Sequence, residues 1–419
     1  MRLDATYLLP IRLSEPADAE LTAYLKSVSR HCRLIVVDGS PDHVFRASHR
    51  SWSAFARHVP PAEHRRCANG KVHGVLTGLD LVGTPLLIIA DDDVRYTHEG
   101  LDQCLHALGD ADLVRPQNYF EPLPWHARWD TARIILNRAT GGDFPGTLLV
   151  RTAALRDAGG YSGDVLFENL EMMRSLERSG AICVSRPDLF VRRLPPTARH
   201  FRSQRVRQAY DEFARPHRLL AALSLLPAAT WVLTTGRSRV LLVGCVTSIA
   251  LAEVGRRRGG GRAWFPGSAS FLAPLWLLER AVCAWCAVWC RLTGGVRYGS
   301  GKLAYAATPR WPRPRPFGHH ARRLSSAAHT PDGSSVSGRG SSPACLMKMK
   351  QQSRAFRWTL RTAARSSSSS RTSAPTTRSV EGSSRTPTTR RLLRKLPTSR
   401  NSSNAMPQSN RRRVAGRSV

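Results

Sequence analysis

Apolar residues in the first part of the chain form short runs that alternate with amphipathic segments. Ala5 to Ile11 and Arg33 to Val37 are short, apolar and contain β-branched side chains, which is typical of strands. Between them, the apolar spacing in Ala17 to Val28 predicts an amphipathic helix. This order predicts a strand-helix-strand unit at the start of the chain.

A similar alternation continues further along. Lys71 to Leu81 is predicted to be helical, and Gly83 to Pro85 forms a turn that leads into Leu86 to Ala90. This last run is apolar at every position, as strands buried on both faces are. We therefore expect an α/β fold with an open mixed sheet and flanking helices. Further predicted strands are 112–116, 147–151 and 181–184, and further predicted helices are 129–137 and 169–179.

The pattern changes beyond Pro216, where long apolar runs begin. Leu219 to Gly236 and Val240 to Ala252 contain no charge, and Trp264 to Cys290 contains only Glu279 and Arg280. A membrane-spanning helix needs about 20 apolar residues, so each run is marginal alone, but their succession and flanking arginines favour a membrane. We expect two or three apolar helices, with two spans plus an interfacial helix as one arrangement. Packed helices of a soluble domain are the alternative.

The end of the chain has a different composition. From residue 301 there are 25 Lys and Arg against Asp332 and Glu381, a net of about +23 out of the formal +33. Ser, Thr, Arg and Pro dominate this stretch, so it cannot bury enough apolar surface to offset the entropy of ordering. The predicted organisation is an α/β domain over 1–216, a membrane-associated helical region over 217–300, and a basic disordered tail over 301–419.

Candidate binding residues follow the predicted strands. In open α/β sheets ligands bind beyond the carboxyl ends of the strands, where this chain has Asp38 and the run Asp91, Asp92 and Asp93. Three adjacent carboxylates repel one another, and a divalent cation, Mg²⁺ or Mn²⁺, is the natural neutralising partner. In an extended segment Asp91 and Asp93 point to one side and Asp92 to the other. A solvated acidic turn is the alternative interpretation.

These motifs occur in the order found in a known enzyme family. Val-Val-Asp38-Gly-Ser, then Asn-Gly-Lys71, then Ile-Ile-Ala followed by Asp91 to Asp93 resembles the nucleotide-sugar half of family 2 glycosyltransferases of the GT-A fold, of a membrane-associated, bacterial type. The resemblance implies that Asp38 contacts the nucleotide base and that Asp91, Asp92 and Lys71 bind the donor. It also implies that Asp91 and Asp93 hold the metal. A water-facing lysine is the alternative for Lys71.

The acceptor half of the family pattern is also recognisable. Gly141 to Thr147 precedes a predicted strand, and Phe167 to Glu171 resembles the segment in which many members carry a Glu-Asp pair whose Asp is the general base. Here Asn169 occupies the place of that Asp, and an amide cannot take up a proton near neutral pH. The candidate catalytic residues are therefore Glu168, the adjacent acid at a helix start, and Glu171.

One more element of the resemblance lies downstream. Gln204 and Arg207 are similar to the Gln-x-x-Arg-Trp element of processive and lipid-linked members, with Gln208 in place of the tryptophan. At helical spacing Gln204 and Arg207 share a face, so both are predicted to contact the donor, with the arginine on its diphosphate. A basic helix that lies on anionic lipid headgroups is the alternative.

Together these features predict a membrane-associated, metal-dependent enzyme. It would move a sugar from a nucleotide-sugar donor to a hydroxyl of a lipid or polysaccharide acceptor, with inversion, at the cytoplasmic membrane and with its catalytic domain facing the cytoplasm. Membrane lipids are expected partners, and no specific nucleic acid is. The alternatives are a nucleotidyltransferase of related α/β fold, or a non-enzymatic polyanion- or membrane-binding protein, given a pI near 11.3.

Overall fold

The computed structural model describes residues 2–299 and 301–308. The strands are β1 Ala5–Ile11, β2 Arg33–Asp38, β3 Arg57–Val59, β4 Leu86–Ala90, β5 Val94–Arg95, β6 Leu113–Phe120, β7 Thr147–Arg151, β8 Cys183–Arg193, β9 Val296–Tyr298 and β10 Gly301–Leu303. The helices before the apolar region are α1 Ala19–His31, α2 Asp42–Trp52, α3 Gly70–Leu81, α4 His98–His106, α5 Trp125–Thr140, α6 Thr152–Asp157, α7 Glu168–Ser179 and α8 Ala198–Tyr210.

Further along the chain lie the apolar helices, α9 Pro216–Thr234, α10 Ser238–Arg257, α11 Ser268–Phe271 and α12 Ala273–Leu292. Short 3₁₀ helices occur at η1 Glu63–Arg65, η2 Asp211–Ala214 and η3 Arg258–Ala263. Each strand and helix predicted from the apolar pattern has a counterpart among the observed elements. Most predicted boundaries differ from the observed ones by a few residues.

Eight strands form one mixed sheet in the order β3-β2-β1-β4-β7-β6-β8-β5. The first four are parallel, β7 runs antiparallel between β4 and β6, and β8 is parallel to β6. Because β1, β2 and β4 are parallel, Asp38 at the end of β2 and Asp91 after β4 lie at the same, carboxyl-terminal side of the sheet. The predicted open mixed α/β sheet with flanking helices is confirmed.

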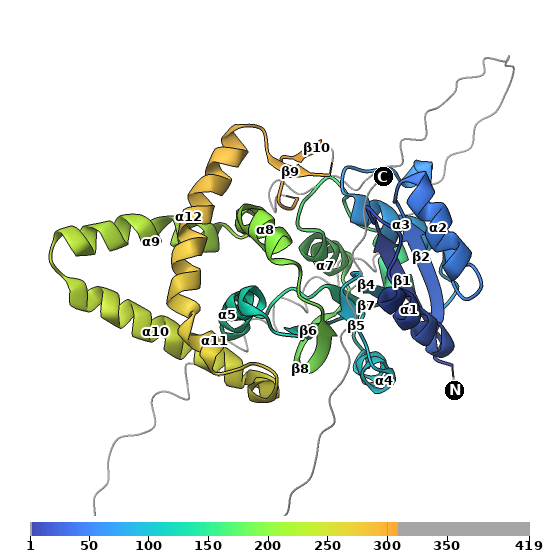
Figure 1. Ribbon diagram of the computed structural model, residues 1–419, viewed down its shortest axis with the longest axis horizontal. Helices are drawn as coiled ribbons and strands as arrows, with labels where there is room; N and C mark the ends of the chain where they lie inside the picture. The colour runs from blue at the N-terminus through green and yellow to red at the C-terminus, as the bar shows by residue number, and fades with distance from the viewer. Residues whose placement is uncertain (1, 300, 309–419) are drawn as a thin grey trace, which may run out of the picture. The chain divides into compact units, whose positions relative to one another are not determined.

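Two apolar clusters cover the two faces of the sheet. On one face β1 and β2 pack with side chains of α1, α2 and α4, among them Leu25, Trp52 and Leu101. On the other face β4 and β7 pack with side chains of α3 and α7, among them Val75 and Met172. Figure 1 shows α4 and α7 on opposite sides of the strands. The burial on both faces explains why β4 is apolar at every position.

Strand β8 is longer than the pattern predicted. The apolar stretch 181–184 predicts only its beginning, whereas the strand continues through Pro187 and ends at Arg193. Its pairing with β6 shifts register between Arg115 and Gln117. The shift accommodates Pro116 and Pro187, which have no backbone N–H to donate to a regular ladder of hydrogen bonds. The extension carries Arg193 to the segment that follows β4, where it pairs with β5.

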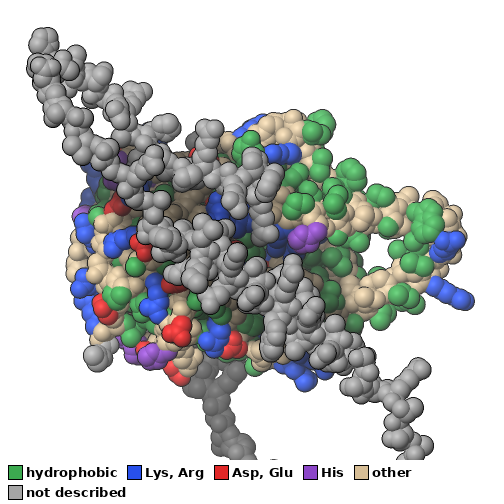
Figure 2. Space-filling view, turned by 180° about the vertical axis from the view of Figure 1, so that it is seen from behind, with side chains coloured by type: hydrophobic (Ala, Val, Ile, Leu, Met, Phe, Trp, Pro, Cys, Tyr) green, Lys and Arg blue, Asp and Glu red, His purple; other side chains and the backbone are tan. Residues whose placement is uncertain are grey.

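Within residues 2–308, three helices are long and apolar enough to cross a membrane, Pro216–Thr234, Ser238–Ala263 and Ala273–Leu292. In Figure 1, α9 and α10 form a hairpin that projects from α12 and the rest of the domain. Large apolar side chains on the hairpin are exposed, among them Trp231, Leu242 and Val246. Figure 2 shows hydrophobic side chains gathered over this projection, with basic side chains near its tip.

The apolar helices are attached to the sheet domain at defined places. Helix α10 packs on α5, and α12 packs on α8 and α9. The carboxylate of Glu279 on α12 accepts hydrogen bonds from Arg205 Nε at 2.5 Å and from Trp129 Nε1 at 2.5 Å. The face of α12 that carries Glu279 therefore packs against α5 and α8.

The last described residues also pack on the domain. Backbone hydrogen bonds join Leu166 N to Tyr305 O at 3.0 Å and Phe167 N to Ala306 O at 2.8 Å, just before α7. The predicted disordered tail lies, beyond Thr308, outside the described residues. The proposed domain boundaries at 216 and 300 stay predictions.

Candidate active site

The run of aspartates lies where β4 ends and the chain turns. The backbone N–H of Asp91 donates to the carbonyl oxygen of Gly146 at 2.7 Å, which ties this turn to the loop before β7. Asp91 and Asp93 line a cavity of about 220 Å³. Asp92 is exposed and lines neither of the two main cavities found among the described residues. The two outer carboxylates thus face one side and the middle one the other.

Two basic side chains hold the outer carboxylates. Lys71 Nζ lies 2.6 Å from Asp91 Oδ1 and 2.9 Å from Glu168 Oε1, so it joins the acidic run to the start of α7. Arg193 Nε lies 2.8 Å from Asp93 Oδ2, and its Nη2 lies 3.4 Å from Asp91 Oδ2. Although burial by itself lowers it, the two carboxylates hold the pKa of Lys71 above its ordinary value. The lysine is therefore a fixed positive charge at this site.

The position of Lys71 follows from a local signal. The side chain of Asn69 caps α3, because its Oδ1 accepts from the backbone N–H of Lys71 at 3.0 Å and of Val72 at 3.4 Å. Lys71 thus stands in the first turn of α3, beside the edge of the sheet at which β4 ends. Its contacts favour a role at the site over the water-facing alternative.

The residues present fit a divalent cation. Asp93 Oδ1 is buried and has no hydrogen-bond partner in the part of the chain that the structure describes, so Arg193 does not satisfy this carboxylate completely. Gly146 keeps the space next to Asp91 open, since a Cβ there would lie 2.7 Å from Asp91 Oδ2. The described residues contain no group of three or more His, Cys, Asp or Glu able to hold a metal. Carboxylates at this site would therefore supply part of the coordination of Mg²⁺ or Mn²⁺, with ligand oxygens supplying the rest.

Asp38 lies in a second and larger cavity of about 960 Å³. The residue is 1% exposed, with Oδ1 accepting from the backbone N–H of Ser40 at 2.8 Å and Oδ2 lying 3.1 Å from His58 Nε2. Burial by itself raises its pKa, but the hydrogen bonds from His58 and Ser40 hold the pKa of Asp38 below the usual value. Asp38 is therefore an ionised group that also fixes the turn after β2.

The acceptor-side candidates occupy different surroundings. Glu168 lines the smaller cavity, and one of its oxygens is held by Lys71. Asn169 lines the same cavity and donates from Nδ2 to the carbonyl oxygen of Pro145 at 2.9 Å. Glu171 is 0% exposed and lies away from both cavities, where it accepts from Arg178 Nη2 at 2.9 Å and from Thr308 N at 2.8 Å. Its contacts are those of a buried structural carboxylate.

Helix α8 supplies the remaining predicted residues. Gln204 and Gln208 line the smaller cavity, whereas Arg207 lines both. The Arg207 guanidinium lies over the Tyr298 ring, 5.4 Å from its centroid, and Tyr298 Oη donates to Asn69 Oδ1 at 2.9 Å. Gln208 accepts from Arg205 Nη1 at 3.0 Å instead of stacking on a ligand as an aromatic residue would. Arg207 thus marks the place where the two cavities meet.

The structure adds residues that the sequence pattern did not single out. Arg193 ends β8, Asp211 begins η2, and Arg280 lies on α12, yet all three line the smaller cavity. Asp211 Oδ1 is buried and has no hydrogen-bond partner among residues 2–308 that the structure describes. Burial and the nearby Glu168 carboxylate raise the pKa of Asp211 to about 7. The charged pair Glu279 and Arg280 inside an apolar run is the one sequence signal that points to α12.

Comparisons with known proteins give structural likenesses only. No family model and no curated protein matches the chain. Among solved structures, a mannosyltransferase from Pyrobaculum calidifontis in complex with GDP-Man and Mn²⁺ is similar at a TM-score of 0.43 and 19% identity, over 68% of this chain and 88% of that one.

Two sugar-phosphoglycerate synthases are similar over less of the chain. Mannosyl-3-phosphoglycerate synthase from Rubrobacter xylanophilus has a TM-score of 0.34 and 12% identity, over 48% of this chain and 69% of that one. Glucosyl-3-phosphoglycerate synthase from Mycobacterium tuberculosis, in complex with Mn²⁺, UDP and phosphoglyceric acid, has a TM-score of 0.31 and 17% identity, over 43% of this chain and 67% of that one. All these TM-scores are below 0.5, so the likenesses do not decide the function of this chain.

Proposed function

We propose that this protein is a membrane-associated glycosyltransferase of the family 2, GT-A type, which transfers a sugar from a nucleotide-sugar donor to a hydroxyl acceptor with inversion. The observation that carries the proposal is the pair Asp91 and Asp93 at the end of β4, with Asp93 Oδ1 buried and unpaired, beside two cavities that meet at Arg207. A nucleoside fits the larger cavity, a diphosphate the charged junction, and a sugar the smaller cavity.

The donor would be held by residues of both cavities. Asp38 and the turn after β2 lie where a base or ribose would bind. Lys71 and Arg193 contact the acidic run, and Arg207 lines the same cavity, so the three supply positive charge suited to a diphosphate. A divalent cation held by Asp91 and Asp93 would stabilise the charge of the departing diphosphate. Asp92 and Gln204 remain proposed donor contacts.

The acceptor hydroxyl needs a group that takes up its proton as the new bond to the sugar forms. We assign this role to Glu168, which lines the cavity beside the acidic run. Asp211 is the second candidate, because its Oδ1 is buried in the same region without a partner. Asn169, which donates to Pro145, holds the loop before β7 instead.

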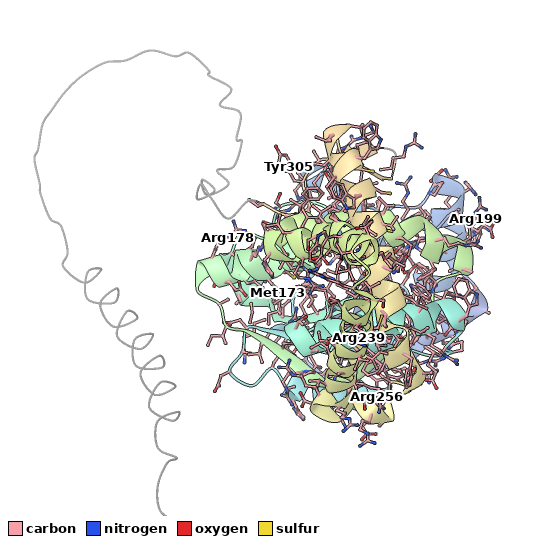
Figure 3. All side chains as sticks on the ribbon, turned by 90° about the vertical axis from the view of Figure 1, so that its left-hand side faces the viewer. Met173, Arg178, Arg199, Arg239, Arg256 and Tyr305 are labelled. Carbon is pink, nitrogen blue, oxygen red and sulfur yellow. The ribbon has the colours of Figure 1, made fainter. Side chains whose placement is uncertain are left out.

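Membrane association is part of the proposal. The exposed apolar side chains of α9 and α10 and the basic residues Arg237 and Arg239 at the hairpin tip suit insertion into lipid with headgroup contacts. Arg239 and Arg256, at opposite ends of α10, are labelled in Figure 3, which views the molecule from the hairpin side. The proposed location is the cytoplasmic membrane with the α/β domain in the cytoplasm, and the acceptor is a lipid or a polysaccharide.

Variants of the acidic run test the proposed donor site. Asp91→Asn and Asp93→Asn each remove a charge that a cation and diphosphate would need, so metal-dependent binding of nucleoside diphosphates should weaken by roughly tenfold or more. The measurement is titration calorimetry of the purified full chain with UDP and GDP, with and without Mn²⁺. Asp110→Asn, an exposed carboxylate after α4, is the matched control. Wild-type affinity in both test variants with metal present would refute the proposal.

A further inference from the structure

Arg280 is a buried arginine to which the structure gives no anionic partner. It lies in the middle of α12 and is 6% exposed. Its Nε and Nη1 atoms are buried and make no hydrogen bond, and among the described residues its side chain makes no ion pair. The guanidinium lies over the Trp276 ring, 4.9 Å from its centroid. Burial of a charge that has neither an ion pair nor hydrogen bonds destabilises the folded protein unless a ligand supplies them.

The neighbouring charges are already matched with one another. Asp130 lies 3.0 Å from Arg205 Nη1 and 3.1 Å from Arg133 Nε. Glu212 lies 3.1 Å from Arg218 Nε and 3.2 Å from Arg215 Nη2. These carboxylates are thus each shared between two arginines. Arg280 adds a positive charge that no ion pair matches among the described residues.

Arg280 lies at the smaller cavity, where its charge is accessible to a ligand. Its side chain lines the smaller cavity together with Arg215, Arg218 and Arg133. This group of arginines comes from α5, α9, α12 and the segment that joins η2 to α9. The donor-side arginines are different residues, Arg193 next to the acidic run and Arg207 at the junction with the larger cavity. The cavity therefore has a second basic region besides the proposed diphosphate site.

We propose that this second basic region binds a phosphate group of a lipid acceptor, with Arg280 as its main ligand. The inference rests on the proposed transfer function and specifies the acceptor of that same site. An arginine fork matches the oxygens of a phosphate, and binding would satisfy the two unpaired nitrogens. A charged residue within an apolar helix is expected to serve a ligand when it faces a polar cavity.

A lipid is the source that the surrounding surface favours. The same helix exposes Leu275, Leu278, Val282 and Trp285 outside the cavity. Helices α9 and α12 pack side by side, so the basic region borders the apolar surface of both. A phosphate that carries an alkyl chain could place its charge at Arg280 and leave the chain along this surface. A free phosphate would gain only the first of these contacts.

The experiment compares three probes on the full-length protein in detergent. Octyl phosphate, octanol and inorganic phosphate are titrated by calorimetry in the presence of saturating Mn²⁺ and nucleoside diphosphate. The wild type should bind octyl phosphate at least about tenfold more tightly than either octanol or inorganic phosphate. Arg280→Gln should lose the preference over octanol, and Arg280→Lys should keep part of it.

Arg239→Gln is the matched control, because Arg239 lies exposed near the hairpin tip, away from the cavity. Thermal unfolding of every variant separates loss of the phosphate site from loss of the fold. The inference is overturned if Arg280→Gln keeps the wild-type preference, if the wild type shows none, or if inorganic phosphate binds as tightly as octyl phosphate. Absence of metal-dependent nucleotide binding in the wild type would instead contradict the proposed transfer function, so the two failures are distinguishable.

Discussion

At the scale of single residues, the site depends on carboxylates that have different partners. Asp91 and Glu168 share Lys71, Asp93 is held on one oxygen by Arg193, and Asp211 keeps an unpaired oxygen. A salt bridge to one oxygen orients a carboxylate, as Lys71 does for Glu168, whereas an oxygen without a partner is available to a metal or a hydroxyl proton. The different partners of these carboxylates distinguish their proposed roles, which the sequence alone does not.

Glu168→Gln tests the proposed proton acceptor. Removal of a general base typically lowers turnover by about 10²- to 10⁴-fold, and we expect that loss here with donor binding preserved. Sugar transfer and nucleotide affinity are measured on the same preparation. Glu177→Gln, an exposed acid on the same helix, should behave as wild type. Unchanged turnover in Glu168→Gln would transfer the role to Asp211.

The raised pKa of Asp211 predicts a pH-dependent contribution to stability. Its pKa is about 7 in the folded chain and about 4 when unfolded, so the folded state binds the proton more tightly. The contribution is fully present below pH 4 and is lost as the pH rises through 7. Asp211→Asn should therefore raise the melting temperature at pH 8 by about 2 to 4 °C and leave it unchanged near pH 4. A gain of equal size at both pH values would contradict this assignment.

At the scale of elements, close packing fixes where the apolar helices meet the sheet domain. Helix α10 approaches α5 so closely that a Cβ on Gly255 would lie 1.8 Å from the carbonyl oxygen of Ile135. Arg138 of α5 donates from Nε to the carbonyl oxygen of Gly255 at 3.0 Å. Glycine at this position therefore permits both the contact and the hydrogen bond.

A pair of glycine substitutions in α10 tests this contact. Gly255→Ala forces the two helices apart and should destabilise the protein by about 1 to 3 kcal/mol, as overpacking does. Gly244→Ala in the same helix meets no atom within 4 Å and should be neutral or slightly stabilising. Thermal unfolding in detergent measures both. Equal effects would show that α10 does not pack on α5 in this way.

At the scale of the whole molecule, the α/β domain and the apolar helices are joined through buried polar contacts. Arg205 of α8 links Asp130 of α5 to Glu279 of α12. The cavity between them takes residues from both regions, so the helices contribute to the proposed acceptor site as well as to attachment. The hairpin of α9 and α10 projects away from this junction.

The mode of attachment is tested by extraction. If the hairpin inserts into lipid, the protein should stay with membranes in high salt and in alkali and dissolve in detergent, since apolar burial does not depend on ionic strength. Immunoblots of the pellet and supernatant measure this. Release by high salt alone would show that electrostatic attraction to headgroups holds the protein instead.

The sequence by itself determined the order of elements and the acidic run. Leu86 to Ala90 is apolar at every position because β4 is buried on both faces, and Asp91 follows it directly, so a local pattern was sufficient to identify both. The capping residue Asn69 likewise sets the start of α3 and the place of Lys71. Each of these features depends on neighbours in the chain.

Only the tertiary structure decided which charges come together. Arg193 is 100 residues from Asp93 in sequence, and Arg280 reaches the cavity from an apolar helix whose sequence shows a charged pair but not what that pair faces. The environment of a carboxylate, such as the Arg178 pairing of Glu171 or the unpaired oxygen of Asp211, depends on segments that pack from elsewhere. Local spacing carries no information on such contacts, because charge pairing and desolvation are set by distance in space rather than along the chain.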